Sequence, residues 1–124
     1  MFNILLVEDN LAIQQLNKEF LEEEGCYNVY TAMNLTEAWK SLKQSTPHLI
    51  VLDIMLPDGS GLDFLKELRQ RGVGVPVLFL TALSESSDAV KSIRAGGADY
   101  IAKPYDSDVL FERIRGLVCR EAVF

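Results

Sequence analysis

The chain has 124 residues, a formal net charge of −6 and 48% hydrophobic residues, which is the size and composition of one globular domain that buries a core without disulfides or metals. The negative charge argues against this stretch itself gripping nucleic acid, and no apolar run is long enough to cross a bilayer. Residues 2–7 are too short for a signal-peptide core and lack a basic lead. We therefore expect one soluble, cytoplasmic domain over residues 1–124, with Cys26 and Cys119 as plain thiols.

Strand and helix patterns alternate five times along the chain. The expected strands are residues 3–7, 27–31, 48–53, 75–80 and 100–102. A helix pattern follows each strand, and the expected capping residues of four of these helices are Asn10, Asn34, Ser60 and Asp106. The first three helices are expected to end at Gly25, before Pro47 and at Gly72.

Four of the helices have a clear apolar face. The expected faces are Ile13, Leu16, Phe20 and Leu21 in the first helix, Leu35, Ala38, Trp39 and Leu42 in the second, Leu65 and Leu68 in the third, and Leu110, Ile114, Leu117 and Val118 in the last. The helix expected at residues 84–95 offers only Ala89, Val90 and Ile93. We therefore expect this fourth helix to be weakly anchored and mobile.

The apolar run at residues 49–52 shows no polar alternation and ends abruptly in Asp53. Such a run is typical of a strand that is buried on both faces of a parallel sheet. An acid that closes this strand lies at the carboxyl edge of the sheet, where open α/β proteins bind their ligands. Taken alone, Asp53 could equally start the turn that contains residues 57–59.

Polar residues follow three other expected strands at the same edge. Glu8 and Asp9 follow the first strand, Thr81 follows the fourth, and Lys103 follows the fifth. Each has a plain structural explanation, as a helix-start acid, a cap or a solvated charge, but their shared position favours a functional site. The connections predict right-handed βαβ crossovers and therefore a five-stranded parallel sheet with helices on both faces.

Three carboxylates and one ammonium at this edge indicate a particular chemistry. The carboxylates repel one another unless they share a cation, and oxygen ligands select a hard ion such as Mg²⁺. The carboxylate of Asp53 can attack phosphorus if the incoming negative charge is neutralised, which Mg²⁺ and Lys103 can do. The Thr81 hydroxyl can donate a hydrogen bond to a phosphoryl oxygen.

With these residues assembled, the whole chain resembles the receiver domain of two-component response regulators. The matching segments are residues 6–10 (LVEDN), 52–61 (LDIMLPDGSG), 80–82 (LTA) and 97–104 (GADYIAKP). The resemblance implies a doubly wound, flavodoxin-like and CheY-like α/β fold with strand order 2-1-3-4-5. It also implies that the chain is no conventional enzyme but catalyses its own aspartyl phosphorylation and dephosphorylation.

The resemblance assigns roles by position. Asp53 would accept a phosphoryl group from a sensor histidine kinase, and Thr81 and Lys103 would grip that group. The implied Mg²⁺ ligands are Glu8, Asp9, Asp53 and the backbone carbonyl of Met55. The peptide bond between Lys103 and Pro104 would be cis. Tyr100 stands at the aromatic switch position of the family, with a strand aromatic half buried at a sheet edge as the alternative.

The last part of the chain resembles the OmpR/PhoB class, whose receivers precede a winged-helix DNA-binding domain. In that class the fourth helix, fifth strand and fifth helix form a dimer face, and Asp99 and Arg113 match one charge pair of it. Lys91 matches the basic member of a second pair, but Val109 stands where its acidic partner would be, and Ala98 replaces one of two adjacent acids. The resemblance thus implies a phosphorylation-linked homodimer, weaker or differently arranged, that reaches DNA only through a further domain. The alternative is a stand-alone receiver in a phosphorelay or docking role.

Two other functions fit the sequence less well. A phosphohydrolase of the haloacid-dehalogenase type needs a second Asp two residues after its nucleophile, and Met55 occupies that position. A flavin or nucleotide module needs a loop rich in Gly, Ser or Thr after the first strand. Here that loop contains Glu8 and Asp9, which would repel a phosphate unless a metal intervened.

Overall fold

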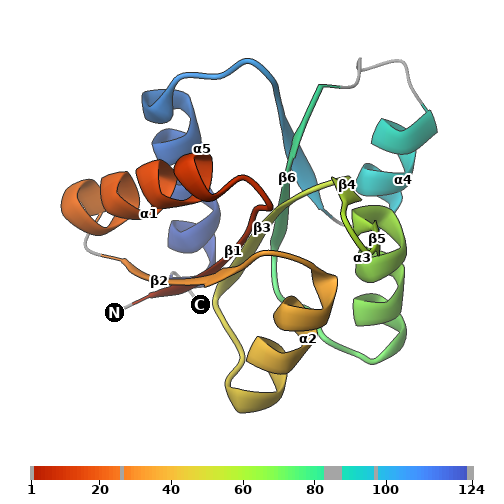
Figure 1. The fold of residues 1–124 in the computed structure, drawn as a ribbon. Coiled ribbons are helices and arrows are strands. Elements are labelled where there is room, and N and C mark those ends of the chain that lie inside the picture. The colour runs from red at the N-terminus through yellow and green to blue at the C-terminus, as the bar shows by residue number, and fades with distance from the viewer. Residues whose placement is uncertain (1, 26, 83–87, 97, 123–124) are drawn as a thin grey trace.

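A five-stranded parallel sheet forms the centre of the computed structural model, which describes residues 2–25, 27–82, 88–96 and 98–122 (Figure 1). The strands are β1 (Asn3–Val7), β2 (Asn28–Ala32), β3 (Leu49–Asp53), β6 (Val77–Thr81) and β7 (Asp99–Ala102). Their order across the sheet is β2-β1-β3-β6-β7, with every neighbouring pair parallel. Counted along this sheet alone, the order is the expected 2-1-3-4-5, and the strand bounds differ from the predicted ones by no more than two residues.

Helices cover both faces of the sheet. One face carries α1 (Leu11–Gly25) and α5 (Ser107–Ala122), and the other carries α2 (Leu35–Gln44), α3 (Gly61–Gln70) and α4 (Asp88–Ala95) (Figure 1). In β3, Ile50 and Leu52 belong to the core under α2, α3 and α4, whereas Leu49 and Val51 belong to the core under α1 and α5. Because both faces of the strand are covered, all of its side chains before Asp53 are apolar, which explains the unbroken run in the sequence.

The helices begin and end largely where the capping residues predict. The side-chain oxygens of Asn10, Asn34 and Ser60 accept hydrogen bonds of 2.8–3.1 Å from backbone N–H groups in the first turns of α1, α2 and α3. Gly72 follows α3 with φ +79°, a left-handed conformation that glycine adopts without strain. In α4, Val90 and Ile93 are buried as predicted. The predicted start of this helix at Ser84 lies outside the described residues.

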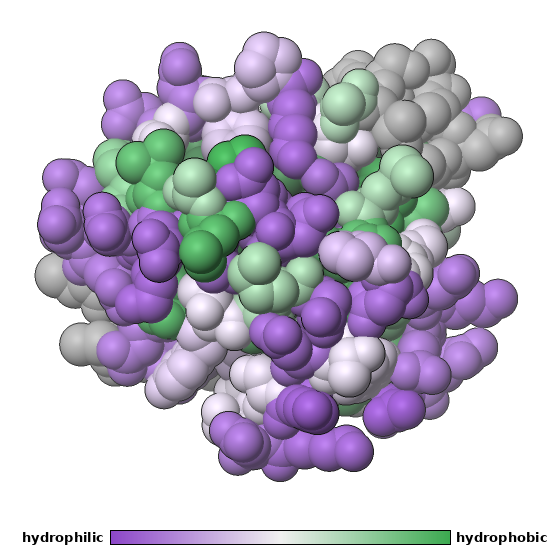
Figure 2. Space-filling view, in the orientation of Figure 1, coloured by the Kyte–Doolittle hydropathy of each residue, from purple (hydrophilic) through white to green (hydrophobic). Residues whose placement is uncertain are grey.

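The face that α1 buries differs from the predicted one. The buried residues of this helix are Gln14, Asn17 and Leu21. Leu16 is 62% exposed and Ile13 is also exposed, so the predicted apolar face was wrong except for Leu21 and the partly buried Phe20. The helix can bury two amides because both find hydrogen-bond partners inside the protein. Ile13 and Leu16 are therefore exposed on α1, and Figure 2 shows hydrophobic surface over this helix.

A short antiparallel hairpin was not predicted. It pairs β4 (Met55–Leu56) with β5 (Gly59–Ser60) immediately after β3. Strands of two residues leave no periodic pattern in a sequence, which explains why this hairpin escaped the prediction. In the described ranges, no helix is long and apolar enough to cross a membrane.

Candidate functional site

The parallel register brings the predicted site residues to one edge of the sheet. Val7 at the end of β1 pairs with Leu52, one residue before Asp53. Asp53 in turn pairs with Leu80, one residue before Thr81, and Thr81 pairs with Ala102, one residue before Lys103. The four strand ends therefore lie side by side, and Glu8 and Asp9 continue from the first of them.

Two short polar contacts at this edge hold the Asp53 carboxylate, one of them from Lys103. The Nζ of Lys103 donates to Oδ2 of Asp53 at 2.6 Å, and the backbone N–H of Ile54 donates to Oδ1 at 2.6 Å. The two side chains keep 24% and 33% of their surface exposed, so Asp53 remains accessible. Burial alone would lower the pKa of Lys103, but the hydrogen bond to Asp53 and the charges of Asp53 and Glu8 outweigh it and raise this pKa. Lys103 is therefore held as a cation beside the Asp53 carboxylate.

Glu8 is the buried acid of the site. Burial raises its pKa, and the nearby charges of Asp9 and Asp53 add to this effect. The backbone N–H of Asn10, which donates to Oε1 of Glu8 at 3.3 Å, and the charge of Lys103 act in the opposite direction. Asp9, in contrast, is exposed. Asp9 and Asp53 thus lie near enough to Glu8 to act on its charge, while Glu8 and Asp9 differ in their contact with solvent.

The chemistry of these side chains suits a hard divalent cation. All the donors are oxygens, and a cation would offset both the burial and the nearby negative charges that raise the pKa of Glu8. In the part of the chain that the structure describes, no three His, Cys, Asp or Glu side chains stand close enough together to hold one ion. Asp53 is bonded to Lys103 instead. Met55, expected to offer its carbonyl, begins β4 with a side chain that is 82% exposed.

The turn after β3 is held close to Asp53. The backbone N–H of Gly61 donates to the carbonyl of Ile54 at 2.6 Å, and a Cβ at Gly61 would overlap the Asp53 carbonyl. Only glycine therefore lets α3 start this near the nucleophile candidate.

Thr81 and Lys103 lie on neighbouring strand ends. Thr81 is buried at the end of β6, and its carbonyl accepts a hydrogen bond of 2.7 Å from the backbone N–H of Lys103. The bond between Lys103 and Pro104 is cis, the isomer that the resemblance implies. These contacts fix the main chain on which both side chains stand.

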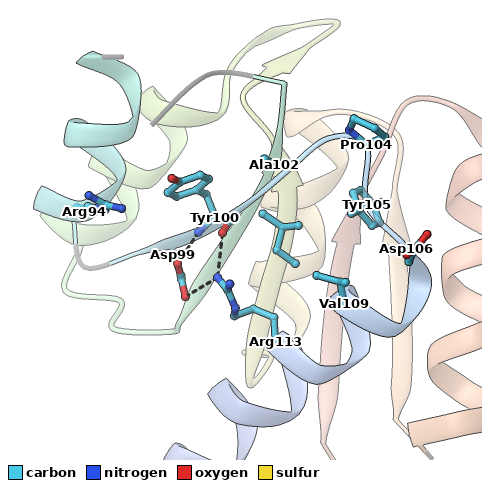
Figure 3. A pocket seen from close by; sticks show the side chains of 10 residues that line it. Arg94, Asp99, Tyr100, Ala102, Pro104, Tyr105, Asp106, Val109 and Arg113 are labelled. Carbon is cyan, nitrogen blue, oxygen red and sulfur yellow. Dashed lines mark hydrogen bonds and ion pairs between the residues drawn. The ribbon is translucent and has the colours of Figure 1, made fainter. Parts of the chain in front are cut away.

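Four of the residues expected on the switch and dimer face, Asp99, Tyr100, Val109 and Arg113, line an open pocket of about 640 Å³ beside β7 and α5 (Figure 3). Tyr100 is buried in β7, and the guanidinium carbon of Arg94 lies 5.7 Å from the centre of its ring. Nη1 of Arg113 lies 3.1 Å from Oδ2 of Asp99 and donates to the carbonyl of Tyr100 at 2.9 Å. Asp99 and Arg113, expected to pair between two copies, thus form an ion pair within one chain. Val109 lines the cavity and is 46% exposed. Lys91 is exposed on α4.

Three polar residues make hydrogen bonds between distant segments that were not predicted from the sequence. Gln14 and Asn17 occupy the buried face of α1, and their only signal was their helical spacing with Leu21. Asp58 accepts hydrogen bonds of 2.7–2.9 Å from the Thr36 hydroxyl and from the first two backbone N–H groups of α2. The Asp58 contact gave no signal, because the partners lie far apart in the sequence.

Comparison with known proteins finds a family match over most of the chain. The family model described as the response regulator receiver domain matches residues 4–115. The chain is 40% identical over 115 residues to the KDP operon transcriptional regulatory protein KdpE of Escherichia coli, covering 93% of this chain and 50% of that protein. It is 38% identical over 120 residues to the probable transcriptional regulatory protein TcrX of Mycobacterium tuberculosis, covering 97% and 51%. The chain thus spans about half the length of these curated relatives.

Solved structures agree with this match. The receiver domain of the Francisella response regulator 1452 superposes with a TM-score of 0.89 at 30% identity, covering 98% of this chain and 99% of that one. The response regulator DrrB, a Thermotoga maritima OmpR/PhoB homologue, superposes with a TM-score of 0.85 at 29% identity, covering 98% of this chain and 54% of that one.

Proposed function

Because this chain belongs to the family of response regulator receiver domains, we propose that Asp53 accepts a phosphoryl group from the phosphohistidine of a sensor histidine kinase. The observation that carries the proposal is the contact of Lys103 with Asp53 at 2.6 Å at the edge where the inner strands end. The Asp53 carboxylate is partly exposed, and the Lys103 ammonium lies beside it. We take residues 1–124 to be one such receiver domain.

In the proposed reaction, a carboxylate oxygen of Asp53 attacks the phosphorus atom. The P–N bond to the kinase histidine breaks, its electron pair returns to the imidazole nitrogen, and an aspartyl phosphate forms. Lys103 neutralises part of the negative charge on the transferred oxygens, and the Thr81 hydroxyl donates a hydrogen bond to one of them. Hydrolysis of the acyl phosphate by water restores Asp53 and releases inorganic phosphate.

Mg²⁺, held by Glu8, Asp9, Asp53 and the carbonyl of Met55, would neutralise further charge on the phosphoryl group. The all-oxygen donor set and the burial of Glu8 among acids support this assignment. The Asp53 carboxylate contacts Lys103 in this structure, so binding of the ion requires the acids to adjust.

The proposed output is control of transcription through a second domain. Relatives of about twice the length are named as transcriptional regulators, which supports this proposal. The alternative, a stand-alone receiver that passes phosphate or docks a partner, needs no second domain. A phosphohydrolase remains disfavoured, because the position two residues after Asp53 holds the exposed apolar side chain of Met55.

Acetyl phosphate, a small phosphoryl donor, tests the proposal. The protein should gain one phosphoryl group by intact mass in the presence of Mg²⁺, and hydroxylamine should remove it because acyl phosphates react with this nucleophile. Chelation of Mg²⁺ should abolish the labelling. Equal labelling of Asp53→Asn would show that the nucleophile is another residue.

A further inference from the structure

The buried face of α1 carries two amide side chains where a helix packed on a sheet ordinarily carries apolar ones. Gln14 and Asn17 are each only 4% exposed and lie three residues apart, so they share one face. A buried amide destabilises a protein unless its hydrogen bonds are made, so these two amides are useful only through their partners.

Gln14 is bonded to the segment that carries the acids of the site. Its Nε2 donates to the carbonyl of Glu8 and to the carbonyl of Ala32, both at 3.1 Å. The backbone N–H of Glu8 donates to the same Ala32 carbonyl at 2.9 Å. Both polar groups of the Glu8 main chain are therefore fixed, one by the end of β2 and the other by Gln14. This arrangement fixes the position of the main chain from which the Glu8 side chain extends.

Asn17 is bonded to the segment that carries Lys103. Its Nδ2 donates to the hydroxyl of Tyr105 at 3.2 Å. Tyr105 is partly buried against the core under α1 and α5, and it follows Lys103 by two residues, across the cis bond to Pro104. A contact that holds Tyr105 therefore restrains the loop from which the Lys103 ammonium reaches Asp53.

We propose that Gln14 and Asn17 are positioning residues for the two halves of the site. Gln14 holds the acid half, which is the segment that carries Glu8. Asn17 holds the lysine half, which is the loop that carries Lys103, through Tyr105. The inference rests on the proposed function of Asp53. It assigns a purpose to the polar face of α1, and it makes this helix the common support of both halves. Neither residue contacts the reacting atoms.

Because the two amides serve different halves, their loss should change different quantities. Gln14→Met keeps the length of the side chain but removes the donor. It should weaken Mg²⁺ binding about tenfold, the lower end of the effect of removing a group that orients a metal ligand. The rate of phosphorylation by acetyl phosphate at saturating Mg²⁺ should change less than about twofold, since a fully loaded site hides a loss of affinity.

Asn17→Leu and Tyr105→Phe should show the opposite pattern. Each removes one side of the same hydrogen bond, which is worth about 1 kcal/mol or about fivefold. The rate at saturating Mg²⁺ should fall about fivefold, because the Lys103 loop is less well held, while Mg²⁺ affinity stays within about twofold of the wild type. Tyr105→Phe loses only a hydroxyl at a partly buried position, so it is the variant least able to disturb the fold.

The measurements are calorimetric titration with Mg²⁺ alone and the rate of acetyl phosphate labelling at saturating Mg²⁺. Gln15→Met is the matched control, since Gln15 is the exposed neighbour of Gln14 on the same helix. Should Gln14→Met fail to fold, Gln14→Asn keeps a polar side chain but withdraws the amide by one methylene. Free energies of unfolding for all variants separate a loss of stability from a loss of positioning.

The outcomes are distinguishable. Wild-type protein that takes up no phosphate would contradict the proposed function. Wild-type labelling with a Gln14 variant that binds Mg²⁺ as tightly as the wild type would overturn the positioning role of Gln14. Variants of both residues that change affinity and rate by the same factors would show a merely structural role for the polar face and would also overturn the proposal.

Discussion

The ammonium of Lys103 lies 2.6 Å from the carboxylate of Asp53, although fifty residues separate them in the sequence and each side chain keeps a quarter to a third of its surface exposed. Ion pairs with this much exposure contribute only about 0–1 kcal/mol to stability, because water screens them. The contact is therefore better explained by chemistry at Asp53 than by a need for stability.

Lys103→Met should separate these two roles. The free energy of unfolding should change by no more than about 1 kcal/mol. The rate of Asp53 phosphorylation by acetyl phosphate should fall by about a hundredfold or more, since a cation that meets developing negative charge is lost. Denaturant unfolding and labelling kinetics measure the two quantities. Lys66→Met, at an exposed position of α3, is the control for loss of a lysine. A labelling rate that resembles that of the control would remove Lys103 from the site.

The acids near Asp53 are expected to favour Mg²⁺ binding while destabilising the metal-free protein. Replacing Glu8 and Asp9 together by Ala should abolish Mg²⁺ binding and leave the fold intact. In a chelator, the variant should be as stable as the wild type or more so, because burial and nearby negative charges disfavour the Glu8 carboxylate in the metal-free protein. Calorimetric Mg²⁺ titration and denaturant unfolding in chelator measure both effects. An unchanged titration would mean that these acids are not ligands.

Asp58 predicts a dependence of stability on pH. The hydrogen bonds from the Thr36 hydroxyl and from the backbone N–H of Leu35 hold the pKa of Asp58 below its usual range. A carboxylate with a lowered pKa stabilises the folded state above the unfolded-state pKa, and this contribution disappears as the pH falls through the folded-state pKa. Asp58→Ala should therefore lower the free energy of unfolding by at most about 1 kcal/mol at pH 7, because the first two N–H groups of α2 lose a solvent-screened acceptor while the Asn34 cap remains.

The same substitution should have a much smaller effect once the pH is low enough to protonate Asp58 in the folded protein. Denaturant unfolding at neutral and at acid pH provides the comparison. Asp58→Asn, which keeps the shape and loses the charge, should lie between the wild type and Asp58→Ala at neutral pH. An equal cost of Asp58→Ala at both pH values would exclude the carboxylate charge as the cause.

The sheet could be predicted from the sequence because its signal is local. The run at residues 49–52 is apolar on both sides because helices cover both faces of β3. Parallel pairing then brings the strand ends to one edge, so Asp53, Thr81 and Lys103 could be grouped from the strand pattern alone.

What could not be predicted depends on contacts between distant segments. Leu16 fits an apolar stripe in the sequence, yet α1 buries Gln14 and Asn17 because the carbonyls of Glu8 and Ala32 and the Tyr105 hydroxyl accept their hydrogen bonds. The partners of a buried amide are not visible in its own helix. The cap that Asp58 provides to α2 escaped prediction for the same reason.

The pair formed by Asp99 and Arg113 predicts how two copies would associate. The resemblance expects these residues to face each other between copies after phosphorylation, whereas the structure pairs them within one chain at 3.1 Å. The chain should therefore be largely monomeric when unmodified, because both charges are already neutralised. With the phosphate mimic beryllofluoride and Mg²⁺, it should shift toward a dimer in which the pairs are exchanged between copies.

Charge reversal distinguishes pairing between copies from pairing within one chain. Asp99→Lys or Arg113→Glu alone should weaken the dimer, because like charges then meet at both symmetric contacts. Reversing both charges in one chain restores the pair within that chain and the pair between copies alike, so this variant does not distinguish the two. Mixing the two single variants restores attraction solely between copies, since each chain alone still holds two like charges. Sedimentation velocity with beryllofluoride should therefore show more dimer in the mixture than in either variant by itself.

Equal association in the mixture and the single variants would show that Asp99 and Arg113 pair only within one chain. Wild-type protein that stays monomeric at high concentration with and without the mimic would favour a stand-alone receiver over a regulator that binds DNA as a dimer.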